Sequence, residues 1–172
     1  MKRIYLVSAI VGSLLASPAL AASSTFFSNL TGSWSGTGSA YLAKTGEISA
    51  TCDLKIAGGE SKVSMQGSCG KFIFHQKLGF TLMNTAGNKY TGIYTGSKTG
   101  PARLEGTLQG NEMRLTITWG GLVNGDRTAK MLLRRTGPNS FVQSVIDQVA
   151  GKTRDTSQFN FTRSQSVAQE SP

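Results

Sequence analysis

Apolar side chains recur at every second position through most of this chain, and this alternation restricts the fold more than any other feature. The clearest run spans residues 48–56, where the apolar positions are Ile48, Ala50, Cys52, Leu54 and Ile56 and the positions between them are polar. A period of two is that of a β-strand with one buried and one solvated face, and not that of a helix. We therefore expect an all-β protein with no helix in its mature part.

Similar runs lie at residues 63–69, 72–82, 102–108 and 113–119, and further strands are expected near 33–42, 88–96, 128–136, 140–148 and 156–163. Turn-forming clusters separate the runs, at Gly58-Gly59, Asn84 to Asn88, Gly96 to Pro101, Gly110-Asn111 and Asn124-Gly125-Asp126. About 8 to 10 strands with short connections predict a single antiparallel up-and-down β-barrel, because closure removes exposed sheet edges. A sandwich is the alternative, but the chain shows no long crossover connection.

The N-terminus has the features of a secretory signal peptide over residues 1–21. Met1-Lys2-Arg3 is basic, residues 4–15 are apolar, and Ala19-Leu20-Ala21 offers a small-residue cleavage site. We expect residues 22–163 to form one barrel domain in the periplasm and residues 164–172 to form a disordered tail. No other apolar run approaches the roughly 18 to 20 residues of a membrane span, so no transmembrane anchor is expected.

The chain is basic, with a formal net charge of +9 that becomes +7 once Lys2 and Arg3 are removed with the signal. Such a surface favours anionic partners, for example acidic glycans, phospholipid headgroups or acidic proteins. The lysines and arginines are scattered singly, which is also typical of an ordinary solvated surface. Aromatic and basic residues are not interleaved as in a stacking platform, so we expect no nucleic-acid binding.

Two cysteines, Cys52 and Cys69, fall on the apolar faces of successive predicted strands. In an exported protein we expect them to form a disulfide. If they lie directly opposite one another, Ile56 faces Met65 and residues 58–63 form the connecting loop. A redox or metal-binding pair is the alternative, but neither a Cys-x-x-Cys spacing nor supporting histidines are present.

Catalytic motifs are absent from the sequence. His75 is the single histidine, and we expect it to be a half-exposed strand residue rather than a base. No nucleophile elbow, zinc-binding helix motif or nucleotide-binding glycine loop occurs. We therefore expect no enzyme activity, no metal site and no cofactor.

Glycines are frequent on the expected inward faces, beside aromatic residues. Gly92 and Gly96 share a face with Tyr90 and Tyr94, and Gly36 and Gly38 lie on the Trp34 face. They either leave room for a ligand or let coiled strands bend.

Residues 119–124 form either a mobile lip over the barrel mouth or a bulge that tucks Leu122 and Val123 into the core. The expected ligand contacts are Tyr90, Tyr94, Trp119, Leu122 and Arg127.

The segment Gly32-Ser33-Trp34 at the first strand resembles the Gly-x-Trp opening of calycin-type barrels, the lipocalins and avidins. The resemblance implies that Trp34 packs across the closed end of the barrel beneath a late basic residue, for which Arg134 or Arg135 is the candidate. The overall layout also resembles small exported proteins of alphaproteobacteria. Phe26 and Phe27, just before the first strand, are expected to plug the barrel end.

The chain is also similar to periplasmic metalloprotease inhibitors, which share an exported small barrel, an early Gly-x-Trp and one disulfide. That similarity implies an inhibitory N-terminal arm, here residues 23–29.

Together these observations predict a non-enzymatic periplasmic barrel that binds an apolar or anionic small molecule or an envelope component. The alternative is an interaction module for an envelope protein or glycan, acting as an inhibitor or an envelope-maintenance factor.

Overall fold

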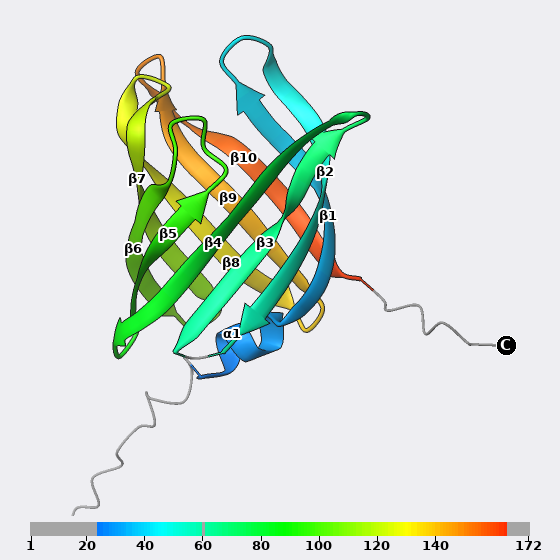
Figure 1. Cartoon of the computed structure of the whole chain (residues 1–172), viewed down its shortest axis with the longest axis vertical. Helices are drawn as coiled ribbons and strands as arrows, with labels where there is room; N and C mark the ends of the chain where they lie inside the picture. The colour runs from blue at the N-terminus through cyan, green and yellow to red at the C-terminus, as the bar shows by residue number, and fades with distance from the viewer. Residues whose placement is uncertain (1–23, 60, 165–172) are drawn as a thin grey trace, which may run out of the picture.

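Each strand pairs antiparallel with the next one in the sequence, and the last strand pairs with the first, so that one sheet closes into a barrel (Figure 1). The computed structural model describes residues 24–59 and 61–164; the predicted signal peptide and almost all of the predicted tail lie outside these residues. The elements are α1 (Ser24–Leu30), β1 (Gly32–Leu42), β2 (Gly46–Gly58), β3 (Lys62–Lys71), β4 (Phe74–Ala86), β5 (Lys89–Thr95), β6 (Ala102–Gln109), β7 (Glu112–Val123), β8 (Asp126–Gly137), β9 (Ser140–Val149) and β10 (Lys152–Arg163). This confirms the all-β up-and-down barrel and excludes the sandwich.

The alternation read from the sequence is the alternation of burial along the strands. In β7, Met113, Leu115 and Ile117 are at most 2% exposed, whereas Arg114 and Thr116 between them face solvent. The inward side chains of all ten strands form one hydrophobic core inside the barrel. Burial of these apolar side chains is the main contribution to the stability of the fold.

The β2–β3 hairpin has the predicted register. Cys52 lies opposite Cys69, and Ile56 lies opposite Met65. The two cysteines are joined by a disulfide, with Cα atoms 4.0 Å apart. The prediction of a bonded pair is therefore confirmed.

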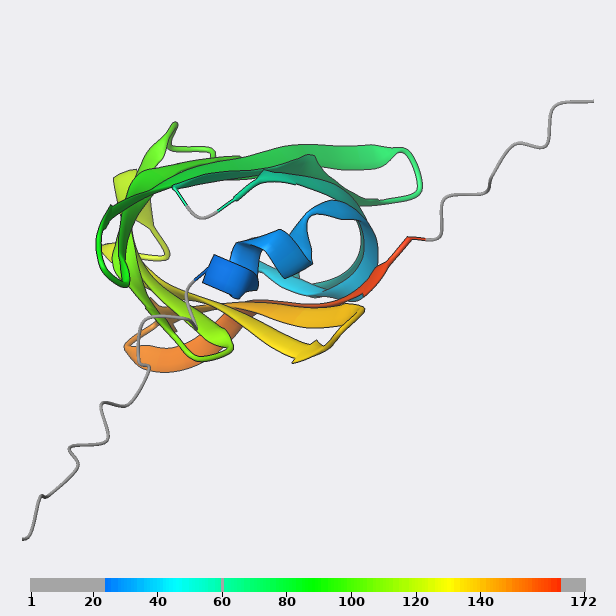
Figure 2. The same cartoon turned by 90° about the horizontal axis from the view of Figure 1, so that it is seen from below.

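A helix that the sequence analysis did not anticipate closes one end of the barrel. Figure 2 shows α1 lying within the ring of strands when the molecule is seen from below. Phe26 and Phe27 are each 1% exposed and Leu30 is 3% exposed, which confirms the plug. The expectation of no helix is wrong. Most of the segment expected to form an inhibitory arm, residues 23–29, lies in α1, whose Phe26 and Phe27 are packed in the core while Thr25, Ser28 and Asn29 are exposed. A helix of seven residues is too short to be stable without such packing.

Two strand boundaries differ from those predicted. The run over residues 72–82 was expected to be strand throughout, but Phe72 and Ile73 form the turn between β3 and β4. The last strand begins at Lys152 rather than near residue 156, and a register shift between Asp155 and Ser157 accounts for the broken alternation at its start.

Candidate ligand-binding site

The end of the barrel that holds α1 is sealed. The Phe27 ring packs edge-on against Tyr90 of β5, with 5.3 Å between ring centroids, and Tyr90 is 2% exposed. Phe141 and Phe161 stack nearby, 4.7 Å apart. Tyr90, which the sequence analysis counted among the ligand contacts, therefore lies in this packed half and apart from the other candidates.

Trp34 and a late arginine complete the seal, but the arginine is Arg163 and not Arg134 or Arg135. The guanidinium carbon of Arg163 lies 4.4 Å from the Trp34 ring centroid. The same guanidinium donates hydrogen bonds to the carbonyl oxygens of Asn29 and Thr31 at the end of α1, each at 2.6 Å. Register explains the difference: Arg163 lies directly opposite Trp34 across the β1–β10 seam, whereas Arg134 pairs with Glu112 of β7 and is exposed.

At the opposite end, which we call the open end, inward-facing side chains are accessible to solvent. Those that are partly buried against the core include Ala40, Ala50, Cys69, Leu78, Tyr94 and Val145. These residues continue the inward faces of β1, β2, β3, β4, β5 and β9 beyond the fully buried layer. The interior is thus filled near α1 and accessible at the open end.

The inward glycines do not create this accessible space. A Cβ at Gly36 or Gly38 would collide with the rings of Phe161 or Phe159 on β10, which lie over these glycines. A Cβ at Gly92 or Gly106 would collide with the backbone of the neighbouring strand. Of the two alternatives, the glycines serve close approach and bending of coiled strands.

Tyr94 and Trp119 meet on the wall of the open half. Their rings contact edge to face, with centroids 6.0 Å apart, although β6 separates their strands. Trp119 is 7% exposed, and within the described residues its indole Nε1–H has no hydrogen-bond acceptor. Burial raises the pKa of the Tyr94 hydroxyl above its ordinary value of 10.0, so it stays protonated and able to donate. Native structures rarely leave a buried donor unpaired, which distinguishes this N–H from the other buried polar side-chain groups of the described residues.

Two buried polar side chains lie on the inward face of β9, and the sequence analysis missed them. Gln143 is 7% exposed and Asp147 is 4% exposed. The Asp147 carboxylate accepts hydrogen bonds from the Asn124 side chain at 3.0 Å and from the Gln148 backbone N–H at 2.7 Å. The sequence contained a signal for them: both occupy the same alternate positions of β9 as Phe141 and Val145, which places them on the inward face.

The segment after Trp119 is a bulge at the rim. The β7–β8 register shifts between Thr118 and Val123, Val123 packs against the core, and Leu122 is 69% exposed. Arg127 of β8 donates to the carbonyl oxygens of Trp119, at 3.4 Å, and Gly120, at 3.1 Å. Arg127 therefore lies next to the Tyr94–Trp119 pair, whereas Leu122 points outward.

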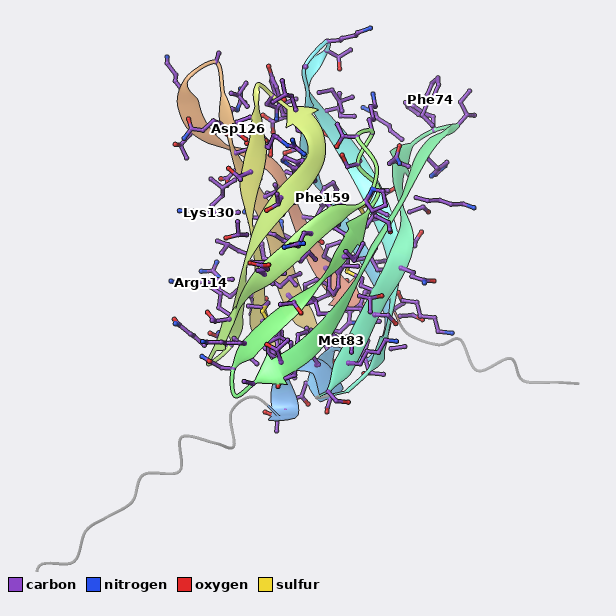
Figure 3. The ribbon with its side chains drawn as sticks, turned by 60° about the vertical axis from the view of Figure 1, so that its left-hand side comes forward. Phe74, Met83, Arg114, Asp126, Lys130 and Phe159 are labelled. Carbon is purple, nitrogen blue, oxygen red and sulfur yellow. A yellow bond between two sulfur atoms is a disulfide. The ribbon has the colours of Figure 1, made fainter. Side chains whose placement is uncertain are left out.

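The remaining candidate features of the described residues are possible metal ligands, the single histidine, a surface groove and membrane-spanning helices. No group of three or more His, Cys, Asp or Glu side chains there could hold a metal ion. His75 is exposed, and its Nε2 lies 2.9 Å from the Phe72 carbonyl oxygen. A groove of about 230 Å³ on the outer surface involves Asp126, Lys130 and Thr116, two of which Figure 3 labels along one flank. None of the described helices has the length and apolar character needed to span a bilayer.

Comparison with known proteins identifies the fold. No protein-family model and no curated protein matches the chain. Among solved structures, Rv2717c from M. tuberculosis matches with a TM-score of 0.64 and 17% identity, over 85% of this chain and 99% of that one. The S-type phycobiliprotein lyase CPES from Guillardia theta matches with a TM-score of 0.60 and 15% identity, over 83% of this chain and 92% of the lyase.

The lyase match corrects one expectation from the sequence. The prediction of no enzyme activity rested on the lack of catalytic motifs, yet a barrel of the same fold is a lyase. Missing motifs are thus no ground for excluding enzymes in this fold. The likeness in structure, with the closed sheet of ten strands, shows that the chain has the calycin-like, lipocalin-type barrel fold.

Proposed function

We propose that the barrel binds an amphiphilic small molecule whose apolar part enters the open half and whose oxygen acceptor receives the Trp119 N–H. The observation that carries this proposal is the unpaired, buried indole donor on an inward face. A ligand with an oxygen acceptor would pair with the Trp119 N–H. Such a ligand would bind more tightly than a similar molecule that lacks the acceptor, because the donor would then stay unpaired.

The surroundings of Trp119 support this class of ligand. Tyr94 adds an aromatic face and a second donor, and the accessible side chains of Leu78 and Val145 are apolar. Arg127 at the rim and the basic surface favour an anionic group on the ligand. An envelope component with an apolar body and an acidic head fits this description.

Export to the periplasm is part of the same proposal. Its support is the signal-like sequence of residues 1–21 together with the Cys52–Cys69 disulfide, because disulfides persist in oxidising compartments. The inhibitor form of the interaction-module alternative has less support, since Phe26 and Phe27 of the segment expected to form an inhibitory arm are packed in the core as part of α1.

The test uses 1-anilinonaphthalene-8-sulfonate, which has an apolar body and an anionic acceptor. We expect saturable fluorescence enhancement with the wild-type protein and affinity reduced about tenfold or more in Trp119→Phe, which removes the donor but keeps an aromatic ring. Tyr90→Phe, in the sealed half, is the matched control and should bind as the wild type does. Equal affinity of the wild type and Trp119→Phe would refute the proposed site.

A further inference from the structure

The tip of the β3–β4 hairpin exposes three large apolar side chains in a row. Phe72, Ile73 and Phe74 are 85%, 86% and 78% exposed. Figure 3 places Phe74 at the outer end of this hairpin, away from the body of the barrel. Single exposed apolar residues are ordinary, but a contiguous exposed cluster marks an interaction site.

The backbone at this tip adopts a conformation at Phe72 that bulky residues usually avoid, and the three side chains point away from the barrel. Phe72 has a φ of +57°, a region that glycine and asparagine adopt readily and a bulky residue does not. His75 Nε2 lies 2.9 Å from the Phe72 carbonyl oxygen, and the Lys71 ammonium lies 5.7 Å from the Phe72 ring centroid. Gly-Asn turns at the other end of the barrel, such as Gly87-Asn88, show that the chain forms hairpins without such residues.

The other hairpin tips at the open end share two properties with this one. Two of them carry further exposed apolar side chains, Leu42 at 40% and Leu122 at 69% exposure. Each of the five tips at this end also carries a lysine or arginine. Within three residues of these turns the basic residues are Lys44, Lys71, Lys98, Arg103, Arg127, Lys152 and Arg154, against the acidic Glu47, Asp126 and Asp147.

We propose that the open end docks on an anionic lipid bilayer, with residues 72–74 inserted among the acyl chains and the basic tips against the headgroups. An anionic bilayer offers negative headgroups over an apolar interior. The basic side chains of the tips can pair with the headgroups, and the projecting apolar residues 72–74 can reach the interior. A second copy of the chain would bring two positive rims together, which like-charge repulsion opposes. The proposal goes beyond ligand binding, because it rests on residues outside the Tyr94–Trp119 pair.

Vesicle flotation tests the docking. We expect the wild-type protein to float with vesicles of phosphatidylglycerol and phosphatidylcholine, and less with phosphatidylcholine alone or at high salt. The triple variant Phe72→Ser, Ile73→Ser, Phe74→Ser should lose at least tenfold in vesicle affinity. Met83→Ser with Ile93→Ser removes two exposed apolar side chains from the outer wall and should bind as the wild type does.

Insertion itself is measured with Phe74→Trp and vesicles of brominated lipids. We expect the new tryptophan to be quenched by bromine in the acyl region, whereas the background from Trp34 and Trp119 in the parent protein should not be. The absence of flotation, equal flotation of the triple variant, or the lack of acyl-region quenching would each overturn the proposal. So would a wild-type dimer that the triple variant dissociates without any lipid dependence. The triple variant should bind 1-anilinonaphthalene-8-sulfonate as the wild type does. Loss of vesicle binding could then not be attributed to damage at the ligand site.

Discussion

Trp34 and Arg163 hold the C-terminal end of α1 against the barrel. The Trp34 indole donates to the Leu30 carbonyl oxygen at 2.7 Å, and Arg163 donates to those of Asn29 and Thr31. The last carbonyl groups of a helix have no partner within it, so these three bonds satisfy acceptors that would otherwise need water. The Gly-x-Trp motif and the last strand therefore act together on the plug.

Replacing Arg163 tests this arrangement. We expect Arg163→Ala to lower the free energy of unfolding by about 2–3 kcal/mol, since it removes charge-assisted hydrogen bonds and the stacking on Trp34. Arg163→Lys should recover only part of the loss, because a lysine cannot present two parallel donors. Chemical denaturation measures both. Arg134→Ala, on the exposed face, should change stability by less than about 0.5 kcal/mol; a comparable loss there would contradict the assignment.

Tyr94 gives the stability a pH dependence at alkaline pH. Burial raises its pKa in the folded state above the value of 10.0 that applies when the chain is unfolded. Above pH 10 the unfolded chain therefore loses this proton first, and stability falls as pH rises. We expect Tyr94→Phe to reduce the steepness of that fall, measured by urea denaturation between pH 9 and pH 11, with Tyr41→Phe as the control. Identical profiles for the wild type and Tyr94→Phe would contradict burial of the hydroxyl.

Part of the site could be predicted at this scale, and the limits are physical. Alternation placed Tyr90, Tyr94 and Trp119 inside the barrel, and all three are there. It could not separate Tyr90 from Tyr94, because parity gives the face of a strand but not the height along the barrel, and four residues span roughly 13 Å. Arg163 was missed for a related reason, since its position opposite Trp34 depends on how the first and last strands meet.

The β2–β3 hairpin shows what can be predicted for an element. Cys52 and Cys69 supply a distance constraint, and only one register both joins them and keeps the apolar faces together. The segment of α1 gave no such signal, because its few apolar residues do not repeat often enough to reveal the 3.6-residue period of a helix. The turn at Phe72-Ile73 was also missed, because it contains none of the residues that usually mark a turn.

Removing the disulfide should destabilise the barrel without changing its register. The sequence separation of 17 residues corresponds to about 3 kcal/mol by the chain-entropy argument. We expect the double variant Cys52→Ala, Cys69→Ala to lose about this amount in guanidinium denaturation while keeping the β-sheet circular dichroism spectrum. Reduction of the wild-type protein should give a similar shift. An unchanged midpoint in both experiments would show that the hairpin gains nothing from the bond.

At the scale of the whole molecule, the two ends of the barrel differ in chemistry. One end is filled by α1 and closed by Trp34 and Arg163, and the other presents accessible inward side chains inside a basic, partly apolar rim. The proposed ligand would enter the barrel at the second end, where the proposed docking surface also lies. Variants of Trp119 and of residues 72–74, which the two proposals do not share, should therefore separate ligand affinity from lipid affinity.

Closure of the sheet predicts uniform stability around the barrel. In an open sheet the first and last strands are edges and fray, but here Trp34 to Ala40 of β1 pair with Ser157 to Arg163 of β10. Native-state hydrogen exchange should give amides hydrogen-bonded across this seam the same opening free energy as those between β6 and β7, near the global value. Amides at the Phe72-Ile73 tip should exchange far faster and serve as the internal control. Seam amides that exchange more than about 100-fold faster than those between β6 and β7, a difference of about 2.7 kcal/mol, would mean that the barrel opens along β1–β10.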